Sequence, residues 1–122
     1  MLEVTHSIAA TNTKQAVIAA GVAVSNEIDL EGYQMAGIEM PSDWDTANLT
    51  FQAASMSGGN YRDLYNDGGN EVLLVAAAGR FVSVSSAALS LAPLRFIKIR
   101  SGSTGTPVNQ SAQRTLTLSL KR

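Results

Sequence analysis

At 122 residues the chain has the length of one domain, and 45% of its residues are hydrophobic while 16% are charged. This composition supplies enough apolar material for a core, with fewer charges than an average soluble protein carries. The net charge of −1 gives no argument for a nucleic-acid or anionic-membrane partner, and the absence of cysteine excludes disulfides, thiolate metal sites and thiol nucleophiles.

The charges are unevenly distributed along the chain. Residues 1–61, the acidic half, contain one cation and seven acidic residues, a balance of −6. Residues 62–122, the basic half, contain eight cations and three acidic residues, a balance of +5. Two interpretations follow. Either strands from the two halves interleave and pair their charges across a sheet, or an acidic face of one copy meets a basic face of the next.

The N-terminal 26 residues are predicted to form an extended arm or edge strands, separate from a domain at residues 27–122. Apolar and polar residues alternate at the start of this arm, which indicates an extended segment that contacts a partner. Its candidate contact residues are Leu2, Val4, His6 and Ile8. Residues 10–15 are polar and predict a turn, whereas residues 15–24 are rich in Ala and Val and favour a strand with a bend at Gly21.

No targeting segment is evident at the N-terminus. Glu3 and His6 interrupt it, and no basic region precedes an apolar run, so it does not resemble a signal peptide. The longest apolar segment, residues 16–24, is too short to span a bilayer. We therefore expect synthesis in the cytoplasm and no association with a membrane.

Short strands follow one another along the rest of the chain. The predicted strands cover residues 27–30, 34–40, 48–54, 61–65, 71–76, 80–84, 95–100 and 115–121. Turn signals separate them at intervals of roughly 8–12 residues, which predicts an all-β fold, either an antiparallel β-sandwich or a jelly-roll-like barrel of about seven to nine strands. The segment 34–40 is expected to bury Ala36, Ile38 and Met40. The segment 71–76 is apolar on both faces, which indicates a central strand, and residues 85–93 are expected to form a crossover.

Trp44, the only tryptophan, lies between Asp43 and Asp45. Two carboxylates beside an aromatic ring can serve a glycosidase or a sugar-binding cleft. In a turn, such carboxylates more often accept hydrogen bonds from backbone donors around a buried ring. Because Pro41 ends the preceding strand, we interpret this stretch as a corner between two strands, with Trp44 as its plug.

Other candidate sites point away from catalysis. His6 is the single histidine and has no cysteine beside it, so a transition-metal site is not expected. Residues 66–71 carry oxygen ligands but lack the spacing of a calcium loop, and the serines lack a nucleophile elbow. The row Phe96, Lys98 and Arg100 on one strand face can bind single-stranded nucleic acid, although a subunit contact is the favoured interpretation. We predict no enzymatic activity, no cofactor and no metal.

Three stretches together carry a resemblance to a known group of proteins. They read IEMPSDWDTANLTFQAAS (38–55), NYRDLYNDGGNEVLLVAA (60–77) and LRFIKIRSGSTGTPVNQSAQRTLTLSLKR (94–122). The pattern resembles small virion structural proteins of tailed bacteriophages, and it extends from about residue 27 to the C-terminus. Such proteins are commonly β-sandwiches that serve as capsid decoration (cement) proteins or as small tail-associated proteins.

The resemblance implies a protein of the virion that is made in the bacterial host cytoplasm. The first hypothesis is a head decoration protein that binds the major capsid protein and copies of itself, with a trimer expected, and that stabilises the capsid lattice. In this hypothesis, the N-terminal arm orders against a neighbour by strand addition. The alternatives are a tail-associated protein or a carbohydrate-binding module that uses exposed aromatic rings. The candidate glycan contacts are Trp44, Tyr61 and Tyr65.

Overall fold

The computed structural model describes residues 11–84 and 94–121, and within these ranges it contains nine β-strands and no helix. The strands are β2 (Thr11–Ile18), β3 (Ile28–Asp29), β4 (Gln34–Glu39), β5 (Leu49–Ala54), β6 (Arg62–Asp63), β7 (Leu73–Leu74), β8 (Phe81–Ser83), β9 (Phe96–Ser101) and β10 (Arg114–Lys121). The crossover predicted at residues 85–93 and the contacts predicted for Leu2, Val4, His6 and Ile8 lie outside the described residues.

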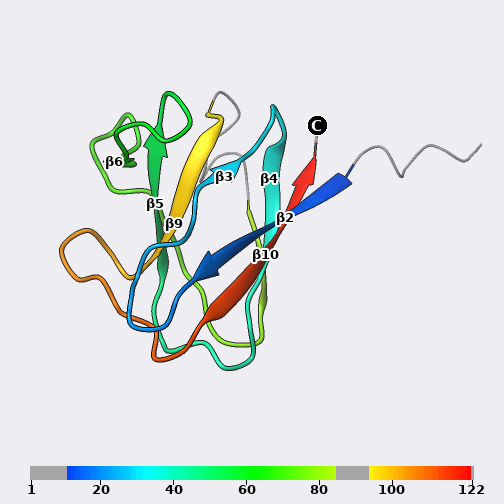
Figure 1. The fold of residues 1–122 in the computed structure, drawn as a ribbon, viewed down its shortest axis with the longest axis vertical. Helices are drawn as coiled ribbons and strands as arrows, with labels where there is room; N and C mark the ends of the chain where they lie inside the picture. Colours follow the sequence, from blue (N-terminus) through cyan, green and yellow to red (C-terminus); the bar gives the residue numbers. More distant parts are fainter. Residues whose placement is uncertain (1–10, 85–93, 122) are drawn as a thin grey trace, which may run out of the picture.

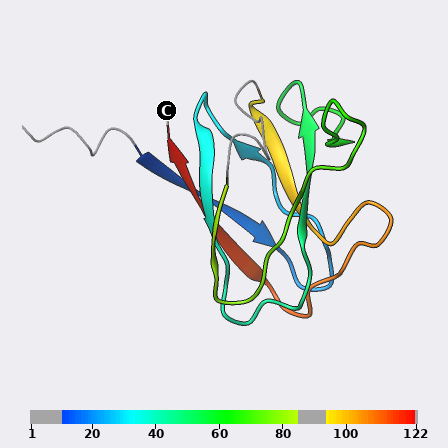
Figure 2. The same ribbon diagram turned by 180° about the vertical axis from the view of Figure 1, so that it is seen from behind.

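The strands form two sheets in which every pairing is antiparallel. The four-stranded sheet has the order β2-β10-β4-β8, and the five-stranded sheet has the order β3-β9-β5-β6, with β7 also paired to β5. Figures 1 and 2 show β5 and β9 in one layer and β4, β10 and β2 in the other. The predicted antiparallel β-sandwich is therefore confirmed.

The two halves of the chain interleave in both sheets. Along each strand order, strands of the acidic half alternate with strands of the basic half. Two charge clusters connect the halves, one between Asp29 and Arg95 and the other between Arg114 and the pair Asp43 and Asp45. The interpretation that charges of the two halves pair across a sheet is confirmed for Asp29 and Arg95, whereas Arg114 pairs with the turn between β4 and β5.

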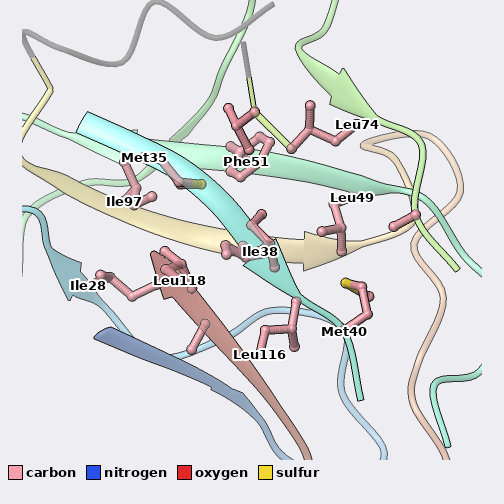
Figure 3. Close-up of a cluster of buried hydrophobic side chains, with 14 of the residues drawn as sticks. Ile28, Met35, Ile38, Met40, Leu49, Phe51, Leu74, Ile97, Leu116 and Leu118 are labelled. Carbon is pink, nitrogen blue, oxygen red and sulfur yellow. The ribbon is translucent and has the colours of Figure 1, made fainter. Parts of the chain in front are cut away.

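The core lies between the two sheets, where alternating residues of each strand meet (Figure 3). Its fully buried side chains come mainly from β10, β9, β5 and β4, and include Leu116, Leu118, Ile97, Ile99, Leu49, Phe51 and Ile38. Because a strand turns alternate side chains to opposite faces, this set leaves Thr115, Thr117 and Ser119 on the outer face of β10. In β9 the same alternation turns Ile97 and Ile99 toward the core.

Of the two forms predicted for residues 1–26, the described part shows an edge strand, β2, which belongs to the sandwich and is not a separate arm. All eight residues of β2 pair with β10, and Ala16 and Ile18 are fully buried. The turn expected at residues 10–15 is wrong from Thr11 onward, because residues 11–18 form one continuous edge strand that pairs with β10. The bend expected at Gly21 is present, and its φ of 81° is a conformation that glycine adopts without steric cost.

Two other strands differ from their predicted form. The register of β10 against β4 shifts between Ser119 and Leu120, so Met35 replaces Ala36 on the buried face. The segment 71–76 is not a central strand. Only Leu73–Leu74 form a strand, β7, and this strand pairs with β5 alone. In this segment, Leu73 is 44% exposed and Val75 is 69% exposed.

Candidate interaction surfaces

The tryptophan corner is a structural element. Trp44 is 5% exposed, and its Nε1–H donates to the backbone oxygen of Ala47 at 3.0 Å. Asp45 accepts the backbone N–H of Ser111 at 2.6 Å, and this bond is the main reason that the pKa of Asp45 lies below its usual range. The predicted burial of Trp44 is confirmed, but the backbone donor that Asp45 accepts from belongs to Ser111, 66 positions away, and not to the turn around the ring. The burial of Trp44 removes it from any exposed glycan-binding platform.

Arg114 locks this corner to the last strand. Its guanidinium lies 2.8 Å from Asp43 Oδ2 and donates to Asp45 Oδ1 at 3.3 Å. Its Nε–H also donates to the side chain of Gln110, which is fully buried and binds both backbone groups of Asp45. Neither Gln110 nor Arg114 stood out in the sequence, because their partners lie more than 60 positions away.

Arg100 is at the centre of a second buried charge cluster. It belongs to the outer face of β9, opposite Ile97 and Ile99, yet it is only 5% exposed. Its guanidinium donates to Thr50, Asp63, Glu71 and Thr104 at 2.8–3.1 Å. These partners satisfy the guanidinium inside the protein, and Arg100 lowers the pKa of Asp63. The prediction of Arg100 as an exposed contact residue is therefore corrected: loops of the same chain cover it.

Lys98, the second residue of the predicted row, also has a partner within the chain. The Lys98 ammonium lies 4.4 Å from the centre of the Tyr61 ring. The Tyr61 hydroxyl donates to Glu27 at 2.6 Å, and Glu27 also accepts the Ser57 hydroxyl and the Gly58 backbone N–H. Burial raises the pKa of Tyr61, and the Gly58 N–H is the main cause of the lowered pKa of Glu27.

Phe96, the remaining residue of the predicted row, lies on the same outer surface. The half-buried Phe96 ring lies 5.1 Å below the guanidinium of Arg95, which pairs with Asp29 at 2.9 Å. We call the outer face of the five-stranded sheet, with its pairs around Arg95, Lys98 and Arg100, the charge-linked face. Its cations are bound by its own carboxylates and rings, so a free basic row is absent from it.

An open depression lies beside this face at one end of β5. It has a volume of about 490 Å³ and is lined by Ala53, Ala54, Ser55, Met56, Gly59, Asn60, Arg62 and Leu94. Its lining is mainly apolar and offers no pair of carboxylates or nucleophile and base. Within residues 11–84 and 94–121, no group of three or more His, Asp or Glu side chains could hold a metal ion.

The outer face of the four-stranded sheet has a different chemistry. We call it the hydroxyl face because short hydroxyl side chains dominate it. Its two central cross-strand rows each take one residue from β2, β10, β4 and β8, in that order. One row consists of Gln15, Thr117, Glu39 and Phe81, and the other of Thr13, Ser119, Gly37 and Ser83. Glu39 and Lys121 are exposed and form no ion pair with any described residue. This face therefore has few charges, and neither of them is neutralised by a residue that the structure describes.

A third surface consists of apolar side chains at the edge of the five-stranded sheet. Leu73 and Val75 are two positions apart and face the same side. Tyr65 is 51% exposed and forms an isolated β-bridge with Glu71, which lies two positions before Leu73. We call Tyr65, Leu73 and Val75 the apolar edge. Of the aromatic residues proposed to stack on a glycan, Tyr65 alone is exposed, because Trp44 is buried and Lys98 lies over Tyr61.

Comparison with protein-family models, curated proteins and solved structures found no match to this chain. No helix long and apolar enough to cross a membrane occurs in the part of the chain that the structure describes.

Proposed function

We propose that this chain is a structural protein of a bacteriophage virion, specifically a head decoration protein that binds the capsid lattice and associates with copies of itself. The single observation that carries this proposal is the apolar edge. Folded monomers rarely leave large apolar side chains together on the surface, and those that do usually bury them against a partner. A partner that repeats over a lattice stabilises each bound copy by mass action.

The rest of the molecule supports a binding role. The two buried arginines, Arg100 and Arg114, donate hydrogen bonds to other residues of the chain and so cross-link the sandwich. The apolar edge lies beside the Arg100 cluster, since Glu71 accepts a hydrogen bond from Arg100 and is also the cross-strand neighbour of Tyr65. This cluster holds the edge rigid, so binding would cost little ordering of the chain.

The test of the apolar edge is occupancy on decoration-free capsids. The variant with Leu73→Ser and Val75→Ser loses two exposed apolar side chains without opening the core, so its fold should be retained while its occupancy falls about tenfold or more. The matched control is Met56→Ser, because Met56 is 64% exposed and belongs to the depression at the other end of β5. Equal occupancy of the double variant and the control would refute this edge as the contact.

The location in the virion is tested by cryo-electron microscopy of the particle. Density over the whole head lattice, at three-fold or quasi-three-fold positions, is the expected result. Density confined to the tail would refute a decoration role and leave the tail-associated alternative.

The role proposed for the N-terminus needs a shorter deletion than the sequence suggested. Because Thr11–Ile18 is an integral strand, removal of residues 1–20 would destroy the fold and report nothing about binding. Removal of residues 1–10 leaves β2 intact, and we expect it to lower capsid occupancy because Leu2, Val4, His6 and Ile8 are lost. Unchanged occupancy would exclude a capsid contact for these residues.

A further inference from the structure

We infer that the hydroxyl face is a docking surface for a second copy of this chain, with the two copies packed sheet against sheet about a two-fold axis. The axis lies between the sheets and runs perpendicular to the strands at the level of Ser119. This inference concerns a different surface from the apolar edge and does not depend on where the protein sits in a virion.

The first support is the shape that the side chains give to this face. Its residues on β10 are Thr115, Thr117 and Ser119, which are half-buried, and their neighbours on β2 and β4 are equally short or polar. Two sheets pack about 10 Å apart when short side chains line both facing surfaces. A flat face with few charges therefore suits a second sheet better than it suits a small ligand.

Phe81 supplies the largest apolar side chain of this face, to which Val17 on β2 also belongs. Its side chain is 62% exposed and lies across Gly37, where an added Cβ would meet the ring at 2.7 Å. The ring therefore fills the gap that the glycine leaves. Large aromatic side chains are enriched among the residues that anchor protein interfaces.

The second support is charge complementarity of the face with itself. Glu39 lies at the level of Thr117, and Lys121 is four positions further along β10. At about 3.3 Å per residue, this offset of about 13 Å is too long for an ion pair within one copy. A two-fold axis at Ser119 exchanges these levels, so Glu39 of each copy comes within side-chain reach of Lys121 on the other.

The free edge of the same sheet is a poorer docking site than its face. Both backbone hydrogen-bonding groups of Val17 are already bound to Asn26. The Val17 N–H donates to Asn26 Oδ1 at 2.7 Å, and the Asn26 backbone N–H donates to the Val17 oxygen at 3.2 Å. Backbone groups alternate along a strand, so Thr13 and Gln15 point to the same free side. Because the Thr13 N–H already binds Asn12 Oδ1, Gln15 keeps the last free donor between residues 13 and 17.

The expected strength follows from the size of the face. Four strands about 4.8 Å apart and about five residues long cover roughly 320 Å² per copy, or roughly 640 Å² for the two copies together. This total is below the range of stable specific interfaces, so we expect weak association in dilute solution that becomes significant at high local concentration.

The experiment is sedimentation velocity of the full chain from about 1 µM to about 1 mM. Glu39→Lys and Lys121→Glu each bring like charges together at two symmetric positions, so each should weaken dimer formation about tenfold. The double variant carrying both changes restores opposite charges across the axis and should return to within about threefold of the wild type. That rescue is the signature of this pairing, because the two residues do not meet within one copy.

The control is Asp67→Lys, which makes the same charge change on an exposed turn of the other sheet. Thermal unfolding of each variant verifies that the fold is retained. The inference is overturned by a wild-type chain that stays monomeric, by single variants that associate like the control, or by a double variant without rescue. Capsid occupancy is a separate measurement, so failure here leaves the proposed decoration role standing, and the reverse also holds.

Discussion

The two outer faces of this sandwich use charge in opposite ways. On the charge-linked face, Arg95, Lys98 and Arg100 each bind a carboxylate or an aromatic ring of the same chain. On the hydroxyl face, Glu39 and Lys121 form no ion pair with any residue of the described ranges. Both faces belong to sheets of similar size that share one core, so the fold itself does not require this difference.

The contrast separates charges that build the fold from charges that remain for a partner. The Arg100 guanidinium uses four of its five N–H donors within the chain and is 5% exposed, so it offers little to another molecule. The face with more charge is therefore the less available one for electrostatic recognition. On the face with fewer charges, Glu39 and Lys121 have no ion pair among residues 11–84 and 94–121, and this is where we place the contact between copies.

The largest effect is expected from breaking the Arg100 cluster. Arg100→Met retains much of the alkyl chain but leaves Asp63 and Glu71 without their cation, and removal of one partner from a buried pair is strongly destabilising. We expect a loss of about 3 kcal/mol in the free energy of unfolding, measured by urea denaturation.

The matched control for this variant is Arg95→Met on the same face. The side chain of Arg95 is 62% exposed, compared with 6% for Arg100, and exposed ion pairs contribute little. The control should cost less than about 1 kcal/mol. Equal losses for the two variants would show that burial does not distinguish these arginines.

A smaller effect is expected from the loop that covers Arg100. Thr104 in this loop accepts from the guanidinium, and Gly102 at its base has a φ of 90°. A Cβ on Gly102 would lie 2.4 Å from the backbone oxygen of Thr106 and 2.8 Å from the backbone nitrogen of Val108. Gly102→Ala should therefore cost about 2 kcal/mol in the free energy of unfolding, because rigid backbone must move.

Gly105→Ala in the same loop is the control, because a Cβ there meets no atom within 4 Å. Its unfolding free energy should stay within about 0.5 kcal/mol of the wild type. If Gly102→Ala were equally mild, the loop would be free to shift away from Arg100 and could not be called a fixed cover.

Local patterns predicted the parts of the fold that depend on neighbours in sequence. Alternation in residues 115–121 identified the buried leucines of β10, and the turn at residues 66–70 follows from the Asn66 side chain, which accepts the N–H groups of Gly68 and Asn70. The corner at Trp44 was also predictable, because a proline stop, two aspartates and the following strand lie within a short stretch.

Long-range pairings could not be predicted in this way. Arg100 looked exposed by its alternation, but Asp63 and Glu71 fold over it from positions 37 and 29 residues away. The run at residues 71–76 is apolar on both sides, so its pattern does not specify which side faces the core, and Val75 became exposed. The polar start of β2 is a strand because β10 offers it a pairing edge, which composition alone does not reveal.

The smallest predicted effect concerns acid, and it again distinguishes the two faces. Hydrogen bonds from Gly58, Ser57 and Tyr61 lower the pKa of Glu27 in the folded chain, and Arg100 lowers that of Asp63. A carboxyl with a lowered folded pKa stabilises the fold above its unfolded value of about 4, and this stabilisation is lost as the pH falls through the folded pKa. We expect the free energy of unfolding to decrease as the pH falls below about 4.5.

Glu27→Gln should make this decrease shallower, since its amide cannot bind a proton in this range, and Tyr61→Phe should have a weaker effect in the same direction because it removes one of three donors. Urea denaturation at a series of pH values measures the slope, and a carbon-detected titration of the Glu27 carboxyl measures its pKa directly. A Glu27→Gln slope identical to that of the wild type would mean that the hairpin loop does not hold this carboxylate in solution. In that case, the charge-linked face would owe its acid sensitivity to the Arg95 and Arg100 pairs alone.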